Sequence, residues 1–160
     1  MARVLLGRRY RFSAAHRLHT PLLSDEENRA IYGKCNYPYG HGHNFVLEIV
    51  ISGELPPVTG RLLPLAALDG FVREVILSRF DHVNLNTQVG EFSALSPTTE
   101  NLSRVVLRRL ESAWPHWFGG RGVKLEKVRI WETGRNIFEE SAGWDSKKEE
   151  LPLDMVTTKS

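Results

Sequence analysis

The chain of 160 residues contains only one cysteine, Cys35, so it cannot form a disulfide bond within itself. A free thiol suits a reducing compartment, and we therefore expect a cytoplasmic protein. No apolar run approaches the length of a membrane-spanning helix, and residues 1–11 lack the apolar core of a signal peptide. These absences predict that the protein neither spans a membrane nor carries an export signal.

The sequence also has little excess charge and no repetition. Its formal net charge is +2 and its basic residues are spread along the chain, which argues against nucleic acid as a partner. We find no internal repeat, no low-complexity segment and no domain boundary. With 41% hydrophobic and 25% charged residues, the chain has the composition of one globular domain with a buried core. We expect this domain over residues 1–143, followed by a polar tail over residues 144–160.

The densest group of reactive side chains lies in residues 33–44, where Cys35, His41 and His43 occur among Gly, Asn and Pro residues. A strand-like run, 45–52, follows directly. If this strand begins at His41, the alternation of side chains places His41 and His43 on one face. Two imidazoles on one face can form half of a zinc site, although a His-x-His pair alone is weak evidence for one. The turn-rich surroundings of Cys35 favour an exposed, reactive thiol over a small buried hydrophobe.

A second strand-like segment, Val4 to His16, precedes this group. His16 ends it and could face His41 and His43 if the two strands pair, whereas the simpler alternative is a lone histidine at a strand end. Three basic residues of this segment could contact a phosphate group, although a solvated strand edge explains them better: Arg8, Arg9 and Arg11.

A short helix is predicted between the two strands. Ser24 and Glu27 form a capping box, and Gly33 is placed to end the helix. Helix capping therefore explains the acidic residues of this segment better than metal binding does. The segment leads the chain to Cys35 and on to the histidine pair.

Two longer helices are predicted in the second half of the chain. Apolar residues recur at helical spacing from Leu65 to about Phe80. A further helix is indicated by Ser96 as its N-cap and Pro97 at its first position, and it should end near Trp114 and Pro115.

Two more strands complete the expected fold. Val123 to Glu132 is strand-like, and Asn136 to Glu140 can pair back on it as a hairpin. The strand after His43 is predicted to be apolar on both faces, which indicates cover on both sides. The order is ββααββ, an α+β fold with a four-stranded antiparallel sheet and two helices on one face.

Six short motifs occur in a fixed order between Arg9 and Ile137. They are Phe12-Ser13-Ala14-Ala15-His16, Gly33-Lys34-Cys35-Asn36, Gly40-His41-Gly42-His43-Asn44, Asp81-His82 ahead of Leu85, Thr98-Thr99-Glu100-Asn101, and Glu132-Thr133. In their joint order and spacing they resemble the 6-pyruvoyl-tetrahydropterin synthase family.

The resemblance implies a tunnel fold, in which the four-stranded sheets of three chains join into a barrel and two trimers stack as a hexamer. It also implies a homo-oligomer, a trimer or a dimer of trimers, that acts on a small pterin. His16, His41 and His43 would be the ligands of a catalytic Zn²⁺, with a fourth position left for substrate oxygens.

Further site residues are also implied by the resemblance. Cys35 would be the base, and Asp81 and His82 would be its relay partners. Glu132 would hold the pterin edge, and the substrate would also contact Thr98 and Thr99. Taken without the family pattern, Asp81 and His82 would simply end a helix, and Glu132 would be a carboxylate in a hairpin turn.

The implied reaction converts 7,8-dihydroneopterin triphosphate to 6-pyruvoyl-tetrahydropterin and eliminates triphosphate, whose contacts could include Lys34. One alternative is the related 6-carboxy-tetrahydropterin synthase of queuosine biosynthesis, whose members usually have a shorter segment between the cysteine and the histidine pair. Another is a non-catalytic pterin- or purine-binding module with a structural zinc. Tyr37 and Tyr39 depart from the small polar residues expected in the cysteine loop.

Overall fold

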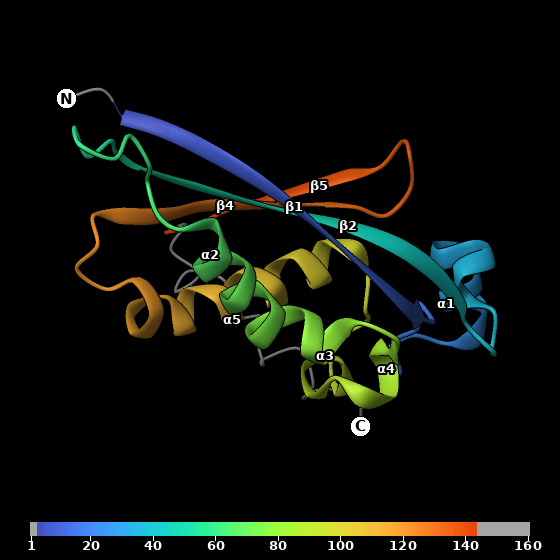
Figure 1. Ribbon diagram of the computed structural model, residues 1–160. Coiled ribbons are helices and arrows are strands. Elements are labelled where there is room, and N and C mark those ends of the chain that lie inside the picture. Colours follow the sequence, from blue (N-terminus) through green and yellow to red (C-terminus); the bar gives the residue numbers. More distant parts are fainter. Residues whose placement is uncertain (1–2, 144–160) are drawn as a thin grey trace.

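The computed structural model describes residues 3–143, and the predicted tail over residues 144–160 lies outside the described residues. Five strands form one sheet in the order β3-β1-β2-β4-β5 (Figure 1). They are β1 (Arg3–His16), β2 (His41–Glu54), β3 (Val83–Asn84), β4 (Val123–Trp131) and β5 (Ile137–Ser141).

The two long strands β1 and β2 pair antiparallel along their whole length, from Arg3 opposite Glu54 to His16 opposite His41. Strands β4 and β5 continue the antiparallel sheet on the far side of β2. On the other side, β3 pairs parallel with β1, but only at two positions. The predicted four-stranded antiparallel sheet is therefore wrong in one respect, because β3 makes the sheet five-stranded and mixed. A two-residue strand is too short to show an alternating pattern in the sequence.

The helices are α1 (Asp25–Tyr32), α2 (Leu65–Val72), α3 (Ser78–Phe80), α4 (Leu85–Gln88) and α5 (Thr99–Phe118). A π-helical turn, Arg73–Leu77, joins α2 to α3, so the predicted helix from Leu65 to about Phe80 is one continuous rod. Figure 1 shows α2, α3 and α5 on one face of the sheet, as expected, and α1 beyond the ends of β1 and β2. Within residues 3–143, none of the helices has the length and apolar character needed to cross a bilayer.

The predicted N-cap of α1 is confirmed, whereas the predicted ends of α5 are wrong. The capping box of α1 is confirmed, because Ser24 accepts a hydrogen bond from the Glu27 amide and Glu27 accepts one from the Ser24 amide. In α5 the N-cap is Thr98 and not Ser96, since the Thr98 hydroxyl accepts the hydrogen bond of the Asn101 amide. The helix also runs through Pro115 and ends at Phe118.

The core lies between the helices and the face of the sheet that they cover. Its largest fully buried side chains are Phe45, Phe71, Phe80, Phe118, Leu47, Ile49, Ile51, Leu68, Ile76, Leu85, Leu102 and Leu110. Burial of so many apolar side chains on one side of β1 and β2 fixes their register, because a slip of one residue would turn each of them outward. The same register determines which side chains meet at the ends of the two strands.

The other face of the sheet is less apolar than predicted. Glu48 in β2 is only 8% exposed and accepts hydrogen bonds from Arg9 of β1 and Arg129 of β4, at 2.9 and 3.0 Å. Arg129 also donates to Glu139 of β5 at 2.5 Å. The strand predicted to be apolar on both faces thus carries a buried carboxylate, which two guanidinium groups compensate.

Candidate active site

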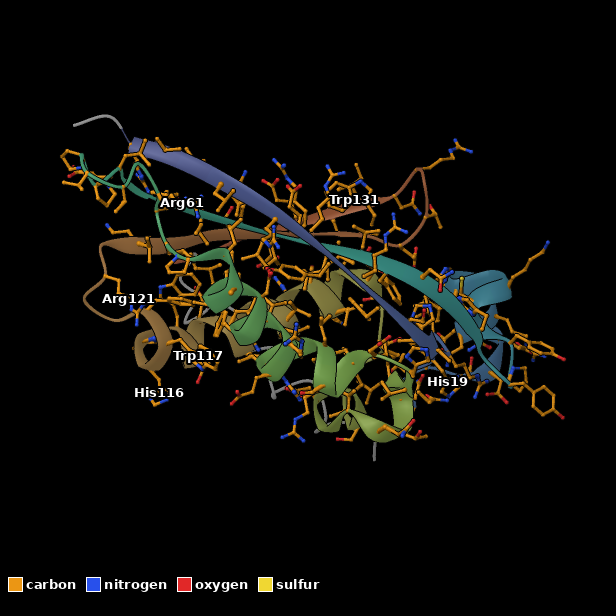
Figure 2. All side chains as sticks on the ribbon, in the orientation of Figure 1. His19, Arg61, His116, Trp117, Arg121 and Trp131 are labelled. Atoms are coloured by element: carbon orange, nitrogen blue, oxygen red, sulfur yellow. The ribbon has the colours of Figure 1, made fainter. Side chains whose placement is uncertain are left out.

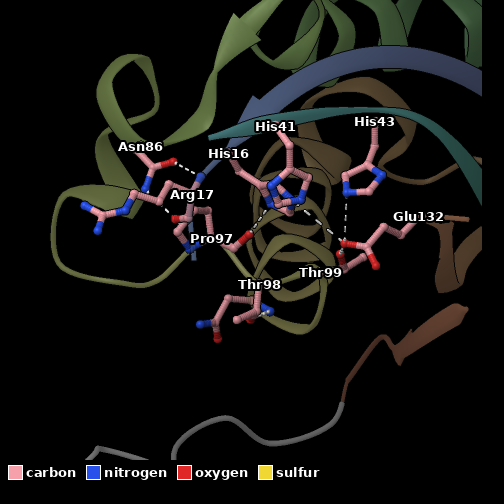
Figure 3. A network of polar contacts seen from close by, with 10 residues as sticks. His16, Arg17, His41, His43, Asn86, Pro97, Thr98, Thr99 and Glu132 are labelled. Carbon is pink, nitrogen blue, oxygen red and sulfur yellow. Dashed lines mark hydrogen bonds and ion pairs between the residues drawn. The ribbon is translucent and has the colours of Figure 1, made fainter. Parts of the chain in front are cut away.

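Strand pairing brings three histidines together where β1 ends and β2 begins. His16 lies directly opposite His41, and His43 lies two residues further along β2 on the same face. One nitrogen from each ring lies within 4.8 Å of the others, and the Nε2 atoms of His16 and His41 are 3.1 Å apart. Figure 3 shows the three rings gathered on one side of the strands. This histidine cluster could hold a metal ion, and three imidazoles suit a divalent transition metal.

The surroundings of His16 and His41 favour the neutral form that binds metals. His16 is 1% exposed, and its Nδ1 lies 2.8 Å from the carbonyl oxygen of Pro97, which directs its Nε2 toward His41. Burial lowers the pKa of His16 despite the opposing effect of the Pro97 carbonyl, and burial followed by the charge of His43 lowers the pKa of His41. Neutral imidazoles are the ligating species, so both pKa shifts favour metal binding.

Glu132 lies beside the histidine cluster, immediately after β4. Its Oε1 is 3.9 Å from Nε2 of His16 and 3.8 Å from Nε2 of His43. The hydroxyl of Thr99, at the start of α5, donates a hydrogen bond of 2.7 Å to the same oxygen (Figure 3). Thr99 therefore fixes the carboxylate, whereas its neighbour Thr98 uses its own hydroxyl to cap α5.

Cys35 belongs to a 3-10 turn, Gly33–Asn36, that follows α1. The thiol is free and partly buried, so it is less exposed than the sequence led us to expect. Burial raises the pKa of Cys35, and the negative charge of Glu132 raises it further. Within residues 3–143, both causes of this shift therefore disfavour the thiolate near neutral pH.

Asp81 and His82 form the predicted pair with each other but lie apart from Cys35. Asp81 Oδ1 is 3.0 Å from Nδ1 of His82 and accepts a 2.8 Å hydrogen bond from the Ser13 amide. The hydrogen bond from the Ser13 amide holds the pKa of Asp81 below its usual range, and His82 lowers it further. Burial acts in the opposite direction but does not outweigh them. In the described part of the chain, no hydrogen bond or ion pair links Cys35 to Asp81 or His82.

The position of His82 explains this separation. Its backbone has a φ of 58°, a left-handed conformation that is rare for residues other than glycine, and its amide donates to the Ser13 carbonyl at 2.6 Å. Its side chain is 82% exposed. It borders a pocket of about 410 Å³ whose lining includes Ser13 and Asn44 as well as His43 of the histidine cluster. The Asp81–His82 pair therefore lies at the outer edge of β1, where it is held by the backbone of Ser13.

The contact between His16 and the Pro97 carbonyl could not be predicted from the sequence. The Pro97 carbonyl orients His16 across 81 positions of sequence. A backbone oxygen leaves no signal in residue type, and the proline itself was interpreted as the first residue of α5. Only the tertiary arrangement of α5 and β1 reveals this partner.

Comparison with known proteins finds similarity to one protein family over most of the chain. Residues 6–142 match the family model described as 6-pyruvoyl tetrahydropterin synthase. The chain is 44% identical over 126 residues to 6-pyruvoyl tetrahydrobiopterin synthase of Poecilia reticulata, covering 79% of this chain and 82% of that protein. It is 42% identical over 132 residues to the Homo sapiens protein of the same name, covering 82% and 87%. The solved structure of Caenorhabditis elegans 6-pyruvoyl tetrahydropterin synthase superposes with a TM-score of 0.80 at 39% identity, over 88% of this chain and 96% of that one.

Proposed function

Because this chain belongs to the 6-pyruvoyl tetrahydropterin synthase family, a family of lyases, we propose that it converts 7,8-dihydroneopterin triphosphate to 6-pyruvoyl-tetrahydropterin with elimination of triphosphate. The observation that carries the proposal is the histidine cluster with Glu132 fixed beside it. Hydrogen moves from the substrate side chain into the ring, so the reaction needs no external reductant. We place the protein in the cytoplasm, where its single thiol stays reduced.

The metal in this proposal is zinc, held by His16, His41 and His43. Three neutral nitrogen donors leave a fourth position open, which is the arrangement of catalytic zinc sites. When bound, zinc supplies a Lewis acid that acidifies the C–H bond next to the substrate hydroxyls and stabilises the negative charge that follows. The Pro97 carbonyl holds His16 in the tautomer that this role requires.

Glu132 binds the pterin in this proposal. One of its oxygens already accepts the Thr99 hydroxyl, so the carboxylate is held in place before the substrate arrives. The pterin edge presents two N–H donors, and a carboxylate that accepts both forms a charge-assisted pair. The 3.8 Å between Glu132 Oε1 and His43 Nε2 supports a pterin site next to the proposed metal ligands. Thr98 contributes indirectly, by capping the helix that carries Thr99.

Cys35 is the proposed base that removes the substrate proton. Its pKa is raised within this chain, so it needs a neighbouring positive charge before it can act as a thiolate near neutral pH. A bound divalent cation supplies one such charge, and the imidazole of His82 oriented by Asp81 can supply another. Since the exposed His82 has no hydrogen bond or ion pair with the Cys35 of its own chain within residues 3–143, we propose that it serves the Cys35 of a neighbouring chain.

Two sheet edges that the described residues leave largely unpaired support assembly into a homo-oligomer. Within residues 3–143, strand β1 is paired on its outer side only at Ala14 and Ala15, and β5 pairs only with β4. Exposed strand edges are sites for pairing with another chain. Leu5 of β1 and Ile137 of β5 are 60% and 55% exposed, which adds apolar surface at the two outer strands. We therefore propose that the sheets of three chains join edge to edge into the barrel of the tunnel fold, with a dimer of trimers as the larger assembly.

Identification of the product tests the proposal directly. The purified protein is incubated with 7,8-dihydroneopterin triphosphate, and the products are separated by chromatography and identified by mass spectrometry. We expect 6-pyruvoyl-tetrahydropterin and free triphosphate in equal amounts. Formation of 6-carboxy-tetrahydropterin would instead favour the queuosine-pathway reaction, and the five residues between Cys35 and His41 argue against that outcome. A lack of turnover with pterin binding retained would identify a binding module.

A further inference from the structure

A pocket of about 580 Å³ borders the histidine cluster on the side of α1. His41 is the ligand that lines it, whereas Glu132 approaches the histidine cluster at His16 and His43. The other lining residues are Arg17, Asp25, Arg29, Gly33, Lys34, Asn36, Tyr37, Pro38 and Gly40. The volume falls within the usual range for small-molecule sites. The pocket and the proposed pterin site thus flank the metal ligands at different histidines.

The wall of this pocket is basic. Arg17, Arg29 and Lys34 contribute three positive charges against the single carboxylate of Asp25. Within residues 3–143 none of these three cations forms an ion pair with a carboxylate. By contrast, Arg8 and Arg109 each hold a carboxylate with two nitrogen atoms. We call this the basic pocket.

Each of the two arginines of the basic pocket is held by a hydrogen bond from its Nε atom to a backbone carbonyl. Arg17 donates from Nε to the Asn36 carbonyl at 3.0 Å, and Arg29 donates from Nε to the Asp25 carbonyl at 3.2 Å. These bonds leave the terminal NH₂ groups of both guanidinium groups available. Donors of this kind bind phosphate oxygens in pairs, and a lysine adds a point charge.

The loop behind the basic pocket is fixed by its own hydrogen bonds. Asn36 is 5% exposed and donates to the Leu18 carbonyl at 2.8 Å, and the Leu18 amide donates to the Cys35 carbonyl at 2.8 Å. Binding of an anion would therefore not have to order this segment first.

We infer that the basic pocket binds the triphosphate group of the substrate, an inference that rests on the proposed function. In a substrate whose pterin binds Glu132 and whose hydroxylated side chain lies at the histidine cluster, the triphosphate would extend past His41 into the basic pocket. The three unpaired cations lie there. Several adjacent cations also suit the leaving group, because eliminated triphosphate carries more negative charge than the ester from which it departs. Of the three N-terminal arginines considered from the sequence, two are engaged elsewhere, Arg8 with Asp69 and Arg9 with Glu48.

The test is titration calorimetry of inorganic triphosphate into the full-length, metal-loaded protein. We expect Arg29→Ala and Lys34→Ala each to weaken binding about tenfold and the double variant about a hundredfold, the usual scale for lost charge-assisted hydrogen bonds. Lys34→Arg should bind nearly as tightly as the native protein. Arg121→Ala is the matched control, since this exposed arginine lies at the end of the molecule away from His19 and α1 (Figure 2). Metal content is measured in each preparation, because triphosphate also binds metal ions.

A second probe, 7,8-dihydroneopterin, carries the pterin without phosphate and separates this inference from the proposed function. We expect the Arg29→Ala, Lys34→Ala double variant to bind it as the native protein does. If the double variant also keeps native affinity for triphosphate, or if the native protein binds no triphosphate, the inference is overturned while the proposed function stands. If triphosphate binding depends on the basic pocket but dihydroneopterin does not bind the native protein, the proposed function fails, and the assignment to this substrate fails with it.

Discussion

At the residue scale, each histidine of the cluster offers one nitrogen close to those of the other two. We therefore expect metal binding to require all three histidines. His41→Ala leaves two nitrogen ligands, and its zinc content should fall from about one ion per chain to near zero. The fold should persist, because His41 lies at the first position of β2, outside the core. Elemental analysis of purified protein measures the zinc. His116→Ala, at an exposed site on α5, is the control, and a full complement of zinc in His41→Ala would refute the assignment.

Glu132 should act on the substrate and not on the metal. Glu132→Gln keeps the shape of the side chain but places an amide donor against the N–H donors of the pterin. The loss should cost roughly 2–4 kcal/mol in pterin binding, as for a charge-assisted pair that becomes mismatched. Fluorescence titration with 7,8-dihydroneopterin measures the affinity, and zinc content should stay unchanged.

Thr99→Val tests how much the hydrogen bond from Thr99 to Glu132 contributes to pterin binding. It removes the hydroxyl that fixes Glu132 and keeps the carboxylate, so its effect should be smaller, about 0.5–1.5 kcal/mol. Native affinity in Glu132→Gln would remove this residue from the pterin site. A larger loss in Thr99→Val than in Glu132→Gln would show that the hydroxyl itself contacts the ligand.

At the scale of elements, one polar contact joins α2 to β1. Asp69 accepts two hydrogen bonds from Arg8, at 2.5 and 2.7 Å, and one from the Tyr10 hydroxyl at 2.9 Å. Asp69→Asn should lower the free energy of unfolding near neutral pH by about 1–2 kcal/mol, a modest value because solvent partly screens the pair. Urea denaturation of both proteins measures the difference. Asp25→Asn, in the exposed first turn of α1, is a control in which a carboxylate is removed without such partners.

The pH dependence of this contact follows from the direction of its pKa shift. The hydrogen bonds from Arg8, assisted by Tyr10, lower the pKa of Asp69 below its value in the unfolded chain, which is about 3.9. The stabilisation is therefore fully present above that value and is lost as the pH falls through the lower, folded-state pKa. The stabilities of the native protein and Asp69→Asn should differ by a constant amount above about pH 5 and converge at lower pH. A difference that grew on acidification would contradict this assignment.

The same scale shows what local sequence can and cannot specify. The capping box of α1 is a self-contained chemical pattern, and it was predicted correctly from Ser24 and Glu27. The start of α5 was misplaced because Ser96, Thr98 and Thr99 all offer hydroxyl groups, and only the chain geometry decides which one caps the helix. The end of α5 was misplaced because Pro115 lies near the helix terminus, where the lost hydrogen bond costs little against the burial of Phe118.

At the scale of the whole molecule, the sequence predicted side chains that share a strand better than side chains that meet in space. Alternation along β2 placed His41 and His43 on one face, and pairing with β1 added His16. The relay between Cys35 and the Asp81–His82 pair followed from the family resemblance, which names residues without saying which chain supplies them. Within one chain the pair is bound to the backbone of Ser13 at the outer edge of β1. The position of His82 depends on the three-dimensional path from α3 to β3, which no local pattern encodes.

This separation is the basis for our proposal that a neighbouring chain of the oligomer completes the catalytic site. His82 directly precedes β3, the strand at one edge of the sheet, so its exposed imidazole lies where an adjoining chain would pair. Cys35 follows α1, beyond the ends of β1 and β2, and faces the charge of Glu132. If His82 of one chain activates Cys35 of the next, each active site draws one group from each of two chains.

Two inactive variants should therefore restore activity to each other when they share an oligomer. Cys35→Ala and His82→Ala should each lose about a hundredfold or more in turnover, the usual scale for a positioned base or its partner. In oligomers assembled from equal amounts of both, roughly a quarter of the sites receive an intact Cys35 and an intact His82. Co-expression with two different affinity tags yields such mixed oligomers, and turnover of 7,8-dihydroneopterin triphosphate is the measurement. Cys35→Ala mixed with the Cys35→Ala, His82→Ala double variant should stay inactive, and an equal lack of recovery in the first mixture would mean that the relay forms within one chain.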